Sequence, residues 1–62
     1  MLRSDVRIGT KFKDPEFPAF GVGEIFNVGE TYFDASFTSP SGTHTWAYLY
    51  EFLHELEVVS DT

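Results

Sequence analysis

The stretch from Phe17 to Phe37 reads FPAFGVGEIFNVGETYFDASF and contains two β-prone runs on either side of a Gly-Glu pair. In the second run, Phe33, Ala35 and Phe37 alternate with polar residues. Alternation with a period of two is typical of a strand with one buried face. The Gly-Glu pair suits a two-residue type II′ turn, in which Gly29 takes a positive φ. The stretch therefore predicts a β-hairpin.

The first run of this hairpin, residues 22–28, carries apolar side chains on both faces. Either Val22, Phe26 and Val28 face the core, or Ile25 does so together with the residues two positions away from it. A strand that is apolar on both faces predicts a bulge or a sharp curve in this run.

The chain has 62 residues, which predicts a single domain spanning 1–62. A domain of this size buries only about 60% of the surface that its unfolded chain exposes, so large side chains must form its core. Seven Phe, three Tyr and one Trp supply them. The sequence has no cysteine for a disulfide and no apolar run of signal-peptide or membrane-spanning length. We therefore expect a soluble, cytoplasmic protein.

Charge is divided unevenly along the sequence. All four basic residues lie in the first thirteen positions, whereas residues 14–62 contain nine acids and no lysine or arginine. The net charge of −6 disfavours direct binding to nucleic-acid phosphates. It favours a protein partner with a basic surface, and it equally suits an aromatic-rich chain that needs charge for solubility.

Shorter patterns predict the elements before the hairpin. Phe12 lies between two lysines in a short strand, with the lysines guarding a sheet edge. Residues 1–8 form either a flexible tail or an N-terminal strand segment. Residues 14–18 contain two prolines and predict a loop, from which Phe17 and Phe20 fold back onto the core.

Residues 47–56 have two interpretations. They form an amphipathic helix, or they form a strand end, a helical turn at 49–54 and a last strand at 55–59. We favour the second, which predicts an all-β fold of five strands near 10–13, 22–28, 31–38, 43–48 and 55–59. Five short strands with one helical turn before the last are the order of a small SH3-like, or Tudor-like, barrel.

The residues that we expect to define the fold are Phe20, Gly21, Gly23, Ile25, Gly29, Phe33 and Phe37. The first four form an F-G-x-G pattern followed by an apolar residue. This pattern resembles the Tudor/SH3-like C-terminal domains of UvrD/PcrA helicases and the RNA-polymerase-interacting domains of CarD and transcription-repair coupling factor. The sequence departs from that group at 14–16, where acids and a proline replace the usual basic residue or histidine.

The resemblance implies a protein-interaction module that binds and modulates a nucleic-acid-processing machine, of the RNA polymerase or helicase class. Small size and acidity fit a phage-encoded modulator of such a machine. Exposed Tyr and Trp beside acids are typical of surfaces that bind basic partners. The candidate partner-binding residues are Tyr32, Asp34, Trp46, Tyr48, Tyr50 and Glu51. Ordinary packing and a cage for methylated lysine are other interpretations of these aromatics.

Catalytic and metal-binding patterns are absent from the sequence. The histidines, His44 and His54, lack the clustered ligands typical of metal sites. We therefore expect no enzyme activity, no metal and no cofactor. Two functional alternatives to the interaction module stay open: an acidic nucleic-acid mimic that blocks a basic groove, and single-strand binding through the basic N-terminal residues.

Overall fold

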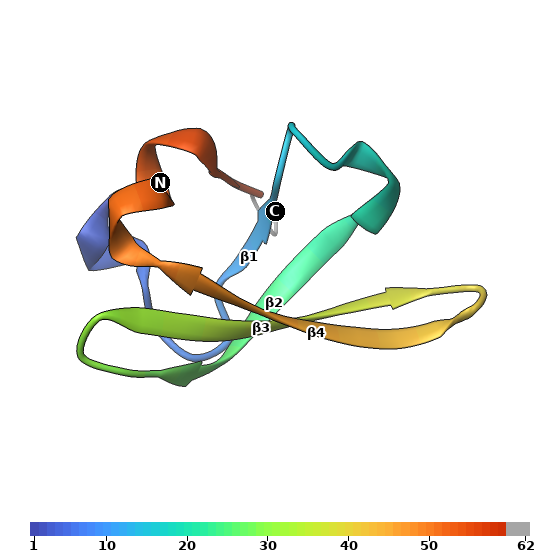
Figure 1. Ribbon diagram of the computed structural model, residues 1–62, viewed down its shortest axis with the longest axis horizontal. Coiled ribbons are helices and arrows are strands. Elements are labelled where there is room, and N and C mark those ends of the chain that lie inside the picture. Colours follow the sequence, from blue (N-terminus) through green and yellow to red (C-terminus); the bar gives the residue numbers. More distant parts are fainter. Residues whose placement is uncertain (60–62) are drawn as a thin grey trace.

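A computed structural model describes residues 1–59, which form one antiparallel sheet with the strand order β4-β3-β2-β1-β5 (Figure 1). Its strands are β1 (Lys11–Lys13), β2 (Val22–Val28), β3 (Tyr32–Ser39), β4 (Gly42–Leu49) and β5 (Glu57–Val58). Three short 3-10 helices accompany them in residues 1–59: η1 (Arg3–Asp5) precedes β1, η2 (Pro18–Phe20) lies between β1 and β2, and η3 (Tyr50–Glu55) lies between β4 and β5. The prediction of an all-β chain with five strands is confirmed. No helix in this part of the chain is long and apolar enough to cross a membrane.

The sheet consists of a three-stranded meander, β2–β3–β4, which β1 and β5 extend on the β2 side. Strands β2, β3 and β4 pair in sequence order, whereas β1 pairs with both β2 and β5. The favoured interpretation of residues 47–56 is confirmed, because β4 ends at Leu49 and η3 precedes the short last strand. Strand β4 and strand β5 form the two edges of the sheet within residues 1–59.

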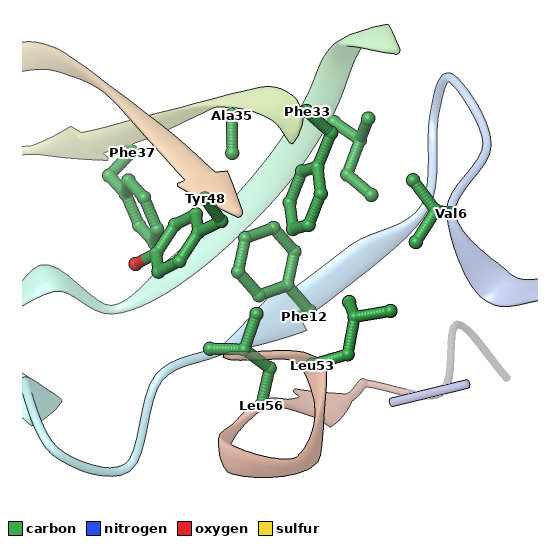
Figure 2. Packing of buried hydrophobic residues seen from close by; sticks show 9 residues of the cluster. Val6, Phe12, Phe33, Ala35, Phe37, Tyr48, Leu53 and Leu56 are labelled. Atoms are coloured by element: carbon green, nitrogen blue, oxygen red, sulfur yellow. The ribbon is translucent and has the colours of Figure 1, made fainter. Parts of the chain in front are cut away.

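Phe12 of β1 lies at the centre of the hydrophobic core (Figure 2). Its ring makes edge-on contacts with Phe33, Phe37 and Tyr48, at centroid distances of 5.6, 5.7 and 5.5 Å. Such T-shaped pairs are a favoured aromatic geometry. The predicted inward face of β3 is confirmed, and so is the inward position of Phe12. The remaining core residues are Val6, Ile25, Ala35, Leu53 and Leu56.

Strand β2 contains the expected bulge. Its pairing with β3 shifts register between Ile25 and Asn27. Ile25 is fully buried, whereas Phe26 is exposed. The register with Phe26 in the core is therefore wrong. An extra residue in one strand turns the next side chain to the other face, which explains the apolar groups on both faces of this run.

The prediction of a type II′ turn with a positive φ at Gly29 is wrong. In the described chain, the glycines with a positive φ are Gly9, Gly21 and Gly42. Instead, the backbone N–H of Gly29 donates a hydrogen bond across the β2–β3 loop to the carbonyl oxygen of Tyr32, at 2.8 Å. A Cβ on Gly29 would lie 2.9 Å from Cε1 of the Tyr32 ring. The glycine therefore leaves room for an aromatic ring, and the turn does not use its conformational freedom.

The N-terminal residues form a 3-10 turn, η1, and no strand. Val6 follows η1 and is buried in the core. The amino group of Met1 donates to the carbonyl oxygens of Leu53 and Leu56, at 3.1 and 2.6 Å. Figure 1 shows η1 beside η3 as a result. The first residues thus attach to η3 and Leu56, with Val6 buried in the core and Met1 packed against it.

Gly23→Ala is expected to lower the free energy of unfolding by about 1–3 kcal/mol. The new Cβ would lie 2.5 Å from Cε1 of Phe37, a core ring, so the ring or the strand must shift. Urea denaturation measures the effect. Glu24→Ala, at the exposed neighbouring position, is the control and should change stability by less than about 0.5 kcal/mol. Equal stability of the two variants would show that the Phe37 ring has room to move.

Candidate binding groove

The buried carboxylate of Asp14 fixes the loop that follows β1. Its Oδ1 accepts a hydrogen bond from the backbone N–H of Glu16 at 3.0 Å, and its Oδ2 accepts one from the hydroxyl of Tyr48 at 3.2 Å. The N–H of Phe17 donates to the carbonyl oxygen of Asp14 at 3.0 Å. Aspartate often stabilises a turn through the N–H two residues on. The loop therefore holds Glu16 and Phe17 at a fixed place beside β4.

A groove of about 250 Å³ lies between this loop, β4 and η3. We call it the Trp46 groove and define it by the six side chains Asp14, Glu16, Phe17, Trp46, Phe52 and Glu55. The rest of its lining comes from Ala47, Tyr48, Leu49 and Leu56. The loop, the edge strand and the 3-10 helix thus each contribute a wall.

Trp46 is 56% exposed although it lies on the core side of the sheet, directly opposite Ala35 of β3. The β3–β4 hairpin, which carries Trp46, extends past the rest of the sheet (Figure 1). The Phe20 ring contacts both Phe37 and Trp46, at centroid distances of 5.4 and 6.3 Å, and Phe17 stacks on Phe20 at 5.2 Å. A row of rings therefore connects the core to the groove.

Trp46 also contributes to the lining of a second hollow, of about 380 Å³. This hollow is formed between η2 and the outer half of the β3–β4 hairpin, and Phe20, Ser39 and His44 contribute to its lining. Among the described residues, Trp46 alone contributes to the lining of both hollows.

The charge around the Trp46 groove is negative. Three carboxylate residues, Asp14, Glu16 and Glu55, contribute to its lining, and no lysine or arginine of residues 1–59 does so. Asp14 is engaged by Tyr48, whereas Glu16 and Glu55 are exposed. An aromatic groove with exposed carboxylates at its rim complements a partner that has both apolar and cationic groups.

The six candidate partner-binding residues that were predicted from the sequence do not form one surface. Tyr32 and Asp34 lie on the outer face of β3, and Asp34 accepts a hydrogen bond from the Asn27 amide at 2.9 Å. Trp46 lies on the opposite face of the sheet. Glu51 is an exposed residue of η3 that does not belong to the groove lining.

The two remaining tyrosines are structural. Tyr48 is buried beside Phe12, which agrees for this residue with the interpretation of the aromatics as ordinary packing. The hydroxyl of Tyr50 donates to the carbonyl oxygen of Gly29, and its ring lies under the Arg3 guanidinium at 4.0 Å. Of the nominated residues, Trp46 alone is both exposed and part of the groove.

Sequence reasoning missed most of the groove. Phe17 was expected to fold onto the core but is 49% exposed, whereas Phe20 packs against the core as expected. Phe52 and Glu55 share the groove because they are three residues apart in η3, a spacing that places them on one side of a 3-10 helix. This spacing of three residues was the signal in the sequence that could have placed Phe52 and Glu55 at the same site. Within residues 1–59, the structure gathers no three His, Asp or Glu residues in a geometry that holds a metal ion.

Raising the pH above 10 is expected to destabilise the protein through Tyr48. Burial, and secondly the neighbouring Asp14 carboxylate, raise the pKa of the Tyr48 hydroxyl well above its ordinary value of 10.0. The folded chain therefore keeps a proton that the unfolded chain loses. The contribution of Tyr48 to stability is complete below pH 10.0 and declines above it.

Urea denaturation at about pH 8 and about pH 11 measures this decline. Tyr48→Phe is the matched variant. It should lower stability at the lower pH by about 1–2 kcal/mol, because it removes the donor to a buried carboxylate, and it should then lose less on going to the higher pH. The same alkaline decline in both proteins would contradict the assignment to Tyr48.

Comparisons of the chain with protein-family models, with curated protein sequences and with solved structures find no match.

Proposed function

We propose that this chain is a small protein-interaction module of the SH3-like, or Tudor-like, type. The support is its topology, in which β1 pairs with both β2 and β5 and the 3-10 helix η3 precedes the last strand. This arrangement brings the first and last strands together, as in a small barrel. The binding site that we propose for the module is the Trp46 groove.

The observation that carries the proposal is a half-exposed tryptophan that lines one groove together with exposed carboxylates. Trp46 offers a large apolar contact area, and Glu16 and Glu55 add negative charge to the lining of the same groove. Tryptophan is over-represented among residues that dominate binding energy, and charges at a rim select the partner and speed its approach. The groove therefore suits a segment with an apolar side chain flanked by lysine or arginine.

For the partner, we propose a nucleic-acid-processing machine of the RNA polymerase or helicase class. Such machines carry basic surfaces for phosphates, and this chain has a net charge of −6. The F-G-x-G resemblance around Gly21 points to the same class. A role as a phage-encoded modulator of a host machine is part of this proposal.

The second candidate function is an acidic mimic of nucleic acid. It is favoured by the nine acids and the absence of bases after Lys13. A mimic would bind through many carboxylates over the whole surface. An interaction module would bind through the few that border the Trp46 groove.

A comparison of two double variants distinguishes these functions. Glu16→Gln with Glu55→Gln removes charge at the groove, and Glu24→Gln with Glu30→Gln removes the same charge from β2 and the β2–β3 loop. We expect the first pair to weaken binding by about three- to tenfold and the second to change it less than about twofold, because surface charges act locally in salt. Equal losses for the two pairs would favour the mimic.

The partner for this titration comes from a pull-down with the tagged chain from nuclease-treated bacterial lysate, at low and high salt. Mass spectrometry identifies the retained proteins, and the purified candidate is then titrated by calorimetry. RNA polymerase or a helicase that is retained at high salt supports the module. A broad set of DNA-binding proteins that is lost at high salt and displaced by duplex DNA contradicts it.

A further inference from the structure

We propose that the partner segment in the Trp46 groove binds as an extended strand that pairs with the free edge of β4. The inference rests on the proposed function, since it concerns the same groove. It adds the conformation of the partner and the backbone groups that bind it.

The backbone groups at the free edge follow from the hydrogen-bonding register of β4. Strand β3 is its only strand neighbour within residues 1–59. Beyond the end of β4, the N–H of Tyr50 donates to the carbonyl oxygen of Thr31 at 3.1 Å. Hydrogen-bonded pairs alternate along an antiparallel ladder, so the backbone groups of Tyr48, Trp46 and His44 also point toward β3.

The alternate residues of β4 therefore present their N–H and C=O groups away from the sheet. These residues are Thr43, Thr45, Ala47 and Leu49. Their spacing is that of a template for one further strand, because every second residue of an edge strand has both backbone groups free.

The groove reaches this edge. Its lining includes four consecutive residues, 46–49, whose side chains alternate between the two faces of the sheet. A hollow over one face alone would contact every second residue. The Trp46 groove therefore lies along the strand edge, and a segment in it has the outward N–H and C=O groups of Ala47 and Leu49 within its reach.

The edge of β4 lacks the usual protection against pairing. Residues 43–49 read THTWAYL and contain no lysine, no acid and no proline. At the opposite edge of the sheet, β5 is two residues long, and its Glu57 pairs with Lys13 at 3.6 Å. Proteins commonly guard exposed edges with short strands and charges, so a long uncharged edge marks a site for strand addition.

Charge selects the occupant of this edge. Glu16 and Glu55 contribute to the lining of the groove that includes β4 residues 46–49, and both are exposed. A second copy of this chain would bring the same carboxylates to the same edge, and each copy has a net charge of −6. The edge therefore suits a basic, apolar strand from a different protein better than self-association.

The experiment uses peptides of about ten residues, long enough to span β4. A displayed library of random peptides is selected on the wild-type chain and depleted on Trp46→Ala, so that the survivors depend on the groove. Amide hydrogen exchange of the chain is then measured by NMR, with and without a selected peptide. We expect the amides of Thr45, Ala47 and Leu49 to exchange at least about tenfold more slowly with peptide present.

A second measurement tests the backbone pairing from the side of the peptide. N-methylation at alternate peptide residues removes donors without altering the protein. N-methylation should weaken binding by about tenfold at the alternate peptide residues whose N–H groups point toward β4, and much less at the residues between them.

Three outcomes overturn the inference in different ways. If no selected peptide depends on Trp46, the proposed function and the inference both fail. If peptides bind but the edge amides and the N-methyl series show no effect, the groove binds through side chains alone, and only the inference fails. If the edge amides become protected without peptide, and sedimentation shows a dimer, the occupant is a second copy.

Discussion

Phe12→Ala is expected to leave the chain largely unfolded in plain buffer. Phe12 is fully buried and contacts three other rings of the core. Truncation of a buried Phe to Ala costs about 3–5 kcal/mol, because it loses transfer free energy and leaves a cavity. A core in a domain of this size rarely supplies more than about 3–5 kcal/mol in total. Far-UV circular dichroism and a urea titration measure the loss.

Phe26→Ala is the matched control, because it removes the same side chain from the bulge of β2, where the ring is 48% exposed. It should change the free energy of unfolding by less than about 1 kcal/mol and keep a cooperative transition. If Phe12→Ala retains a cooperative transition with a midpoint close to that of the wild type, the core is not organised around Phe12.

Trp46→Ala is expected to weaken partner binding by at least about 2 kcal/mol, or about thirtyfold in Kd. Trp46 contributes to the lining of both hollows and is the largest exposed side chain of the Trp46 groove. The same variant should keep most of the wild-type stability, because more than half of the side chain is already exposed. Calorimetric titration against the partner, together with a thermal melt of each protein, separates the two effects.

Tyr32→Ala is the control for this experiment, since it removes an exposed aromatic from the outer face of β3. We expect its affinity to stay within about twofold of the wild type. Loss of binding in Tyr32→Ala with no loss in Trp46→Ala would move the site to the outer face, where the nominated Asp34 also lies.

The strands were predictable because their signals are local. The alternation around Phe33 and the single apolar residue of β1, Phe12, determine which faces are buried, and the structure bears out both. The bulge in β2 was foreseen from its two apolar faces. The turn at Gly29 was not, because the need for glycine comes from the Tyr32 ring across the loop. Pattern alone cannot distinguish that need from a positive φ.

Most of the groove could not be predicted from the sequence, because contacts between segments that are distant in the sequence create it. The bond between Asp14 and Tyr48 joins residues 34 positions apart and sets the loop against β4. The alternation of His44, Trp46 and Tyr48 predicts that their side chains lie on the same face of β4. It does not predict which of these side chains the rest of the chain covers. In the structure Tyr48 is buried, whereas Trp46 is exposed although it lies opposite the buried Ala35.

The pairing of β1 with β5 has a consequence for the order of folding. The hairpins β2–β3 and β3–β4 join neighbours in sequence, whereas Phe12 must meet Val58 across most of the chain. Closing such a long loop has an entropic cost that only the last contacts offset. We therefore expect the meander to form before the rate-limiting barrier and β5 to dock after it. Changes in β5 should then accelerate unfolding while leaving the refolding rate nearly constant.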